Sequence, residues 1–182
     1  IDGAANDTKV WFSWQGHYWV RAFVSMAKTF KDPKYMDQAV ALIDHMFYYT
    51  DEMRQSRGEI NVSATPYESA PLYLLQNPSV PAPGWRIGVG GTRNEWRNQT
   101  LDDGQITHPI LRFVELVKSD PVRWEAYMSK ADEYLKKCEV IVNLHDSLFV
   151  FDRTVGIDGS YYYPRPDGTG LYSGAVPLNH SA

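Results

Sequence analysis

The chain has 182 residues, 43% of them hydrophobic, and a formal net charge of −4. That length allows one domain with a sizeable core. An acidic chain is a poor partner for nucleic acid, whose phosphates require a basic surface, so we expect no nucleic-acid partner. No stretch approaches the roughly 20 consecutive apolar residues that a membrane-spanning helix requires, so we also expect no membrane span.

A single cysteine, Cys138, excludes an internal disulfide and a cysteine-based zinc cluster. The histidines lack metal-ligand spacing, such as two histidines four residues apart on one helix. The glycine-rich run at 88–91 lacks the Lys-Ser/Thr pair of a phosphate-binding loop. The sequence therefore predicts no metal site and no cofactor.

The first predicted helix covers about residues 13–30, and its large apolar side chains recur mostly every four residues. Such a broad stripe predicts a helix that is buried on much of its circumference. Asp32 is a favourable N-cap and Pro33 a favourable first helical residue, so a second helix is expected over about 33–49. The turn between the two helices is short, which predicts antiparallel neighbours. The stripe consists of Trp11, Trp14, Tyr18, Ala22, Met26 and Phe30.

A second pair of helices is expected over about 104–118 and 121–144. Thr107 is the expected cap of the first of these, with Pro109 in its first turn, where a missing N–H does no harm. The turn at Ser119-Asp120-Pro121 repeats the Lys31-Asp32-Pro33 turn. The chain is therefore predicted to contain two helical hairpins that are built alike.

The remaining segments are richer in proline, glycine and β-branched or aromatic residues. Residues 51–100 are expected to form a long connection with a short strand at 58–64 and a helical turn at 67–76. Residues 148–151 and 161–163 are predicted to form a short β-hairpin. Residues 176–182 resemble the entry to a fifth helix, so we expect chain 1–182 to be a single domain or a fragment of a larger one.

Polar residues open three of the expected helices, in stretches 14–23, 101–108 and 177–180. We expect these three starts to lie at the same end of the fold and to face one cleft. The aspartate-capped hairpin at 32–39, the stretch Asp103-Gly104-Gln105-Ile106-Thr107-His108-Pro109-Ile110 and the closing Pro177-Leu178-Asn179-His180 resemble the helical hairpins of (α/α) toroid proteins. That superfamily includes polysaccharide lyases, six-hairpin glycoside hydrolases and sugar epimerases. The resemblance implies a mainly α fold: antiparallel helical hairpins of an incomplete (α/α) toroid, with long loops and a short β-hairpin.

The resemblance also implies a polysaccharide substrate, and the polar helix starts then supply the candidate catalytic residues His17, Asp103, Asn179 and His180. The candidate substrate-binding residues are Trp14, Arg86, Trp96, His108 and Tyr161. A glycosidase needs two carboxylates, and Glu68 or Glu95 is the candidate partner of Asp103. A lyase instead needs a base and a group that neutralises the substrate carboxylate. For this the candidates are Asn179, His180, His17, Arg86 and Tyr161.

Asn-x-Ser/Thr sequons occur at four positions, which is more than this composition gives by chance. Asn6, Asn61 and Asn98 are the expected loop acceptors for glycans, whereas Asn179 is assigned to the cleft. These sequons favour a secreted or extracellular protein, or a periplasmic one in a bacterium.

Two hypotheses follow from these observations. The first is an enzyme, a polysaccharide lyase or glycoside hydrolase, that acts by β-elimination or hydrolysis. The alternative is a non-catalytic extracellular glycan-binding or structural glycoprotein module. In both, the expected partner is a glycan, together with the remainder of its own toroid or other subunits. Convergence of His17, Asp103 and Asn179 in one open pocket favours the enzyme.

Overall fold

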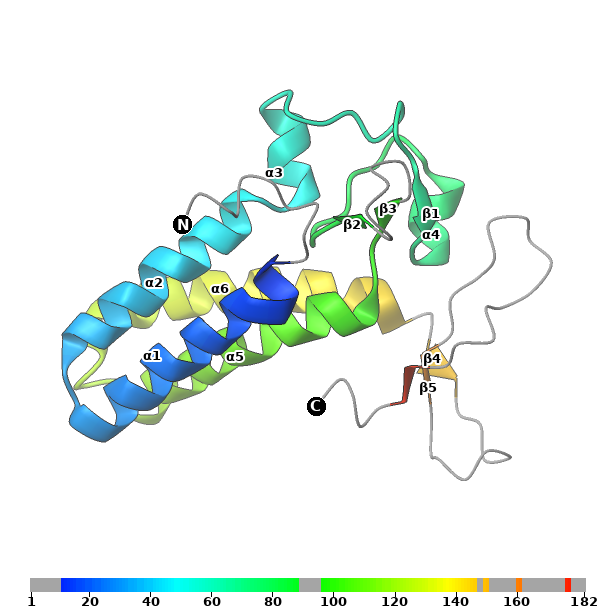
Figure 1. The fold of residues 1–182 in the computed structure, drawn as a ribbon. Coiled ribbons are helices and arrows are strands. Elements are labelled where there is room, and N and C mark those ends of the chain that lie inside the picture. The colour runs from blue at the N-terminus through cyan, green and yellow to red at the C-terminus, as the bar shows by residue number, and fades with distance from the viewer. Residues whose placement is uncertain (1–10, 89–95, 147–148, 151–159, 162–175, 178–182) are drawn as a thin grey trace.

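A computed structural model describes residues 11–88, 96–146, 149–150, 160–161 and 176–177. The fold is mainly α-helical, as predicted. The long helices of this part of the chain are α1 (His17–Phe30), α2 (Pro33–Tyr48), α5 (Thr100–Ser119) and α6 (Met128–His145). Helices α1 and α5 lie side by side and run in the same direction, whereas α2 and α6 run in the opposite direction (Figure 1).

Local sequence explains how α1 ends and α2 begins. A π-helical turn, Phe12–Gly16, leads into α1, and Lys31 ends it with a left-handed φ of 54°. The Asp32 carboxylate then accepts a hydrogen bond of 3.0 Å from the backbone N–H of Lys34, and Pro33 is the first helical residue. This is the capping arrangement predicted from the sequence, and it satisfies an N–H that otherwise has no partner inside the helix.

Helix α5 begins earlier than expected, at Thr100, and the predicted cap at Thr107 is wrong. Thr107 lies inside the helix, where its hydroxyl donates to the backbone carbonyl of Asp103 over 2.7 Å. Pro109 is likewise an interior helical residue. The first turn holds Asp102 and Asp103, whose negative charges favour the positive end of the helix dipole. Helix α6 begins later than predicted, after the short 3-10 helix Glu125–Tyr127.

The buried face of α1 is not the predicted aromatic stripe. Val20, Val24 and Ala27 are buried, whereas Trp14 is 59% and Tyr18 60% exposed. Small and β-branched side chains allow α2 and α5 to approach α1 closely, so the large aromatic rings lie outside. Trp19 and Phe30 are also exposed on this helix.

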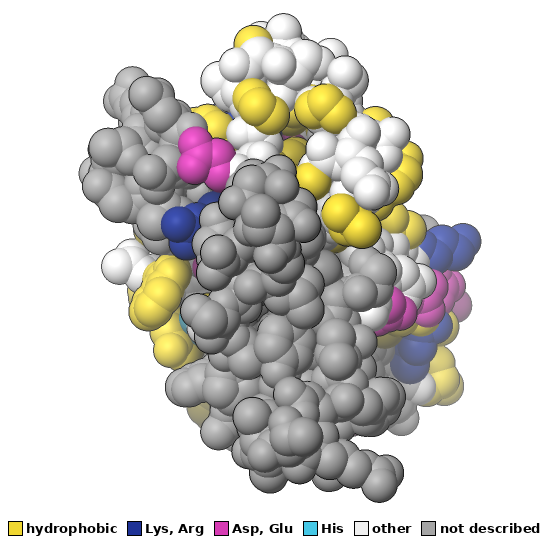
Figure 2. Space-filling view, turned by 90° about the vertical axis from the view of Figure 1, so that its right-hand side faces the viewer, with side chains coloured by type: hydrophobic (Ala, Val, Ile, Leu, Met, Phe, Trp, Pro, Cys, Tyr) yellow, Lys and Arg dark blue, Asp and Glu magenta, His cyan; other side chains and the backbone are white. Residues whose placement is uncertain are grey.

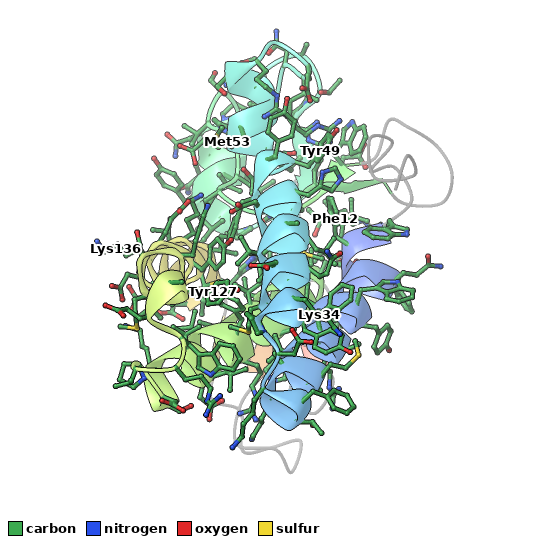
Figure 3. The ribbon with its side chains drawn as sticks, turned by 90° about the vertical axis from the view of Figure 1, so that its left-hand side faces the viewer. Phe12, Lys34, Tyr49, Met53, Tyr127 and Lys136 are labelled. Atoms are coloured by element: carbon green, nitrogen blue, oxygen red, sulfur yellow. The ribbon has the colours of Figure 1, made fainter. Side chains whose placement is uncertain are left out.

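Helices α2 and α6 are joined by hydroxyl and ammonium groups along their length. The Tyr127 hydroxyl donates to Asp37 over 2.6 Å, and Figure 3 shows Tyr127 between the two helices. The Tyr134 hydroxyl donates to Asp44 over 2.7 Å, and the Lys130 ammonium donates to the same carboxylate over 2.8 Å. Together with the α1–α5 contact, these bonds give two layers of parallel helices around one core. The core includes Met36, Ile43, Met46, Ile110, Phe113, Tyr134 and Cys138.

The connection between α2 and α5 forms a small subdomain at one end of the helices. Its elements are α3 (Asp51–Ser56), β1 (Tyr67–Ser69), α4 (Leu72–Gln76), β2 (Ile87–Gly88) and β3 (Trp96–Arg97). The strand order is β1-β3-β2, with β1 and β3 parallel and β2 antiparallel to β3. The predicted strand at 58–64 is wrong, because the Asn61 side chain instead forms a turn with the backbone N–H of Ser63. In Figure 2, hydrophobic side chains gather at the top, over this connection.

After α6, the described backbone forms a second small sheet. Strands β4 (Phe149–Val150), β5 (Ser160–Tyr161) and β6 (Val176–Pro177) are antiparallel neighbours in the order β4-β5-β6. The predicted helix entry at 176–182 is wrong for its first two residues, since Val176 and Pro177 pair as a strand. Among the helices described here, none combines the length and apolar content needed to cross a membrane.

Candidate functional site

The starts of α1 and α5 lie together, and a hydrogen bond joins them. Asp102, in the first turn of α5, accepts a hydrogen bond from the Ser13 side chain in the turn that precedes α1. Asp102 is 4% exposed, and burial raises the pKa of its carboxyl to about 6 because the charged form loses solvation. The Ser13 bond opposes this rise, and neighbouring Asp103 adds to it.

His17 lies at the first position of α1 and is half-buried. Burial lowers the pKa of the imidazole below its ordinary value of 6.5, and nearby Arg21 and His108 act in the same direction. The backbone carbonyls of Ser13 and Phe12 oppose that change. His17 is therefore mostly neutral at neutral pH, and a neutral imidazole can accept a proton.

A groove of about 600 Å³ runs along α1 and α5, and its lining begins one helical turn beyond His17, at Arg21 and His108. We call it the α1/α5 groove. Arg21, Ser25 and Lys28 line it from α1, and His108, Arg112 and Glu115 line it from α5. Arg112 and Glu115 form an ion pair across one turn of α5. The groove thus combines three cationic side chains and one carboxylate with a histidine and hydroxyl groups.

Asp103, like its neighbour Asp102, does not line this groove. It is 1% exposed, and its carboxylate accepts hydrogen bonds from the backbone N–H of Trp85 over 3.2 Å and from Nδ2 of Asn98 over 3.0 Å. The same carboxylate lies 2.8 Å from Nε2 of His145. Gly84 permits this packing, because a Cβ at that position would lie 2.6 Å from both carboxylate oxygens. Asp103 is therefore enclosed by its neighbours and closed to solvent.

His145 was not among the residues selected from the sequence. It lies at the end of α6, is 2% exposed, and places its Nδ1 3.1 Å from the hydroxyl of Thr100. The Asp103 network consists of Asp103, His145, Thr100, Asn98 and the Trp85 backbone. It joins the end of α6 to the start of α5 and to the connection before α5. A histidine in the last helical turn was the only sequence signal for this role.

Arg86 belongs to a second buried cluster, here called the Arg86 network. Its guanidinium lies 2.6 Å from the Asp51 carboxylate, and both side chains are fully buried. Asp51 also accepts a hydrogen bond from the Tyr67 hydroxyl, and Arg86 donates to Thr65. Burial is the largest influence on the Asp51 carboxyl and raises its pKa, whereas the charge of Arg86 opposes that rise. The Arg86 guanidinium also lies 4.9 Å from the centre of the Trp96 ring, which is 9% exposed.

The structure thus separates the residues that the sequence placed in one cleft. His17, Trp14 and His108 lie on the accessible side of α1 and α5, where Trp14 and His108 are exposed. Asp103, Arg86 and Trp96 are buried on the other side of the α5 start and in the connection before it. Residues 178–182, with Asn179 and His180, lie outside the described residues, and only the backbone of Tyr161 is described, in β5.

The sequons differ in accessibility. Asn61 is exposed, and Asn6 lies outside the described residues. Asn98 is fully buried, and its Nδ2 donates to Asp103 and to the carbonyl of Trp85. Since Nδ2 is the atom that carries an N-linked glycan, the folded structure leaves no place for a glycan on Asn98.

Within the described ranges, no group of three or more His, Cys, Asp or Glu side chains has the arrangement of a metal site. Comparison of the chain with protein-family models, curated proteins and solved structures finds no match. The functional argument therefore depends on the geometry described above.

Proposed function

We propose that this chain is part of a carbohydrate-active (α/α) toroid that acts on a polysaccharide by hydrolysis or β-elimination. Two successive hairpins of a toroid place their inner helices parallel in one layer and their outer helices parallel in another. The pairs α1 with α5 and α2 with α6 are compatible with that arrangement (Figure 1). In an up-and-down four-helix bundle the parallel helices lie on the diagonals, whereas here the parallel helices α1 and α5 are in direct contact.

The observation that carries the proposal is the shared start of the two inner helices. Residues 14–18 at this start carry the half-buried imidazole of His17 and exposed aromatic rings at Trp14 and Tyr18, and two residues that line the groove, Arg21 and His108, lie near His17. Sugar rings have flat apolar faces that pack on exposed aromatic side chains. An imidazole with a lowered pKa accepts a proton at neutral pH, which both hydrolysis and elimination require of a base.

In this proposal His17 is the base and Trp14 a sugar platform. Asp102 has a positioning role, because its bond to Ser13 fixes the start of α1 against the start of α5. His108 lines the groove beside Arg21 and is a substrate-binding group. Asn179 and His180 keep their predicted catalytic roles. Asp103 has no place in the proposed cleft, since its carboxylate is fully occupied inside the protein.

The burial of Asp103 and Arg86 also favours a second candidate, a glycan-binding module without catalysis. Asp103 was expected to be catalytic and Arg86 to bind substrate, and both instead stabilise the connection before α5. Either function agrees with an extracellular location, for which the exposed sequon at Asn61 is the support among the described residues.

A product assay separates the candidates. Purified protein is incubated with a panel of uronate-containing and neutral polysaccharides, and new reducing ends and unsaturated sugar products are measured. We expect both signals for elimination and reducing ends alone for hydrolysis. Binding to a polysaccharide without either product supports the module, and no binding to any member of the panel refutes both.

Variants then assign the base. His17→Gln should abolish cleavage and keep binding, whereas His45→Gln, a matched change on α2, should leave cleavage unchanged. The rate of the unaltered protein should rise with pH and then level off, with its half-maximal point below pH 6.5, because the pKa of His17 is lowered from that value. Full cleavage by the His17→Gln protein would remove His17 from the mechanism.

A further inference from the structure

The α1/α5 groove carries more positive than negative charge, although the chain as a whole is acidic. Among the described residues that line it, the cations are Arg21, Lys28 and Arg112, and the one carboxylate is Glu115. Arg112 and Glu115 pair with each other and keep 52% and 61% of their side chains exposed. The groove therefore attracts an anion despite the net charge of −4.

Two of these cations have no acidic partner among the described residues. Neither Arg21 nor Lys28 forms an ion pair there, whereas Lys34, Lys118 and Lys137 on the other helices each pair with a carboxylate within 2.9 Å. Unpaired cations at the wall of a groove are free to bind an external anion.

The spacing of the cations suits an extended ligand better than a compact one. Arg21 and Lys28 are seven residues apart on α1, which is two helical turns or about 10 Å. Arg112 lies on the opposite wall. Charges distributed along a groove match a chain that carries an anion on successive units, whereas a single phosphate or sulfate is held by donors that converge on one point.

The other lining groups favour a sugar chain over a nucleic acid. Hydroxyl groups of Ser25, Thr29 and Ser119 line the groove, and its lining among the described residues includes no Phe, Tyr or Trp. Single-stranded nucleic acid binds through base stacking on aromatic rings within a basic channel, and duplex DNA needs a larger basic surface. Hydroxyl groups can donate to and accept from the hydroxyls of a sugar.

We propose that the α1/α5 groove binds an acidic polysaccharide, a polyuronate whose carboxylates contact Arg21, Lys28 and Arg112. This inference rests on the proposed function and names its substrate class. The sugar chain lies along α1 and α5, with one end at His17 and Trp14. The Glu115 carboxylate opposes binding, both by its own charge and by occupying Arg112.

Direct binding tests this inference without any need for cleavage. The probes are oligomers of galacturonate, of mannuronate and of hyaluronan. The first two are also used with their carboxylates methyl-esterified, and single-stranded DNA of similar charge is included. We expect at least one acidic oligomer to bind, its neutral form to bind at least tenfold more weakly, and added salt to weaken the acidic complex.

Charge variants of the groove give opposite expected effects. Lys28→Gln and Arg112→Gln should each weaken binding about two- to fivefold, as expected for exposed charge pairs. Glu115→Gln should strengthen binding by a similar factor, because it removes the repelling charge and frees Arg112. The matched control is Lys136→Gln on α6, which removes the same charge from the outer side of that helix (Figure 3) and should have no effect.

Three results would overturn the inference: no binding of any acidic oligomer, equal binding of the esterified forms, or tighter binding of DNA. Equal effects of Lys28→Gln and Lys136→Gln would also overturn it. Binding without any cleavage product supports the acidic ligand and refutes only the catalytic proposal. Cleavage of a neutral polysaccharide at a rate that the groove variants do not change supports the catalytic proposal and refutes the acidic ligand.

Discussion

The α1/α5 groove and the buried networks before α5 contain similar residue types in opposite situations. In the groove, Arg21 and Lys28 lack acidic partners among the described residues, and half-buried His17 lies one helical turn before Arg21. In the buried networks, Asp103 and Arg86 have their partners within the protein at hydrogen-bond distance. Residues with chemically reactive side chains thus form two sets. One set is accessible to a ligand, and the other already has hydrogen-bond partners within the protein.

The difference has an energetic origin. A buried charge must be paired and hydrogen-bonded, so its removal is expected to change stability. An exposed cation contributes little to folding, so its removal is expected to change ligand binding alone. Mutations that separate the two effects therefore test the division directly.

The largest expected effect is on the Arg86 network. Arg86→Met leaves the Asp51 carboxylate buried without its cation and should lower the free energy of unfolding by about 3–5 kcal/mol. The double variant Asp51→Leu/Arg86→Met removes both charges and should recover most of that loss. Urea unfolding of the three proteins measures both effects, and a loss below about 1 kcal/mol in the single variant would contradict a buried ion pair.

The Asp103 network should be nearly as sensitive. Asp103→Ala removes the acceptor for Asn98, for His145 and for the backbone N–H of Trp85, and should cost about 3 kcal/mol. Binding of a polyuronate by the folded fraction should not change. The measurement is urea unfolding paired with a binding titration under conditions where the variant is folded. Normal stability with lost binding would show that Asp103 contacts the ligand.

The pH dependence of stability should report Asp102. Its pKa of about 6 in the folded protein exceeds its ordinary value of 3.8, so the folded state holds the proton more tightly. The stability contributed by this group is complete below pH 3.8 and is lost as the pH rises through about 6, with a change on the order of 3 kcal/mol. Asp102→Asn should remove this change, as measured by urea unfolding from pH 3 to pH 8. A difference between the two proteins that is independent of pH would contradict the raised pKa.

Two glycines provide a smaller, paired test. Gly84→Ala places a Cβ against the Asp103 carboxylate and should destabilise the protein by about 1–2 kcal/mol. Gly104→Ala, in α5, meets no atom within 4 Å and should stabilise the protein by about 0.5–1 kcal/mol, because alanine favours a helix. Thermal unfolding of both variants gives the comparison, and equal effects would contradict the close packing at Gly84.

Much of the helical framework could be predicted from the sequence. Asp32 and Pro33 mark the start of α2 by local chemistry, and the apolar residues of α5 and α6 recur at helical spacing. The buried side of α1 could not be predicted, because apolar side chains occur beyond the side of the helix that packs in the core. Only tertiary packing selects Val20 and Val24 over Trp14 and Tyr18.

The site was predicted less completely than the helices. The starts of α1 and α5 lie at the same end of the fold, as expected from the sequence, whereas the catalytic role of His17 stays a prediction. Local sequence could not distinguish Asp102 from Asp103, since adjacent helical residues point in different directions and the deciding partner, His145, is 42 positions away. Long-range pairing also explains the position of Arg86. Its ion pair with Asp51 is buried, so Arg86 does not line the cleft predicted from the sequence.

The central claim is that the α1/α5 groove binds the ligand and that the Asp103 network only stabilises the fold. The most direct test is the dissociation constant of the tightest-binding polyuronate oligomer for the folded Asp103→Asn and Arg112→Gln proteins, measured side by side. The account predicts an unchanged dissociation constant for Asp103→Asn and a dissociation constant about two- to fivefold larger for Arg112→Gln. Weaker binding by Asp103→Asn together with unchanged binding by Arg112→Gln would contradict it.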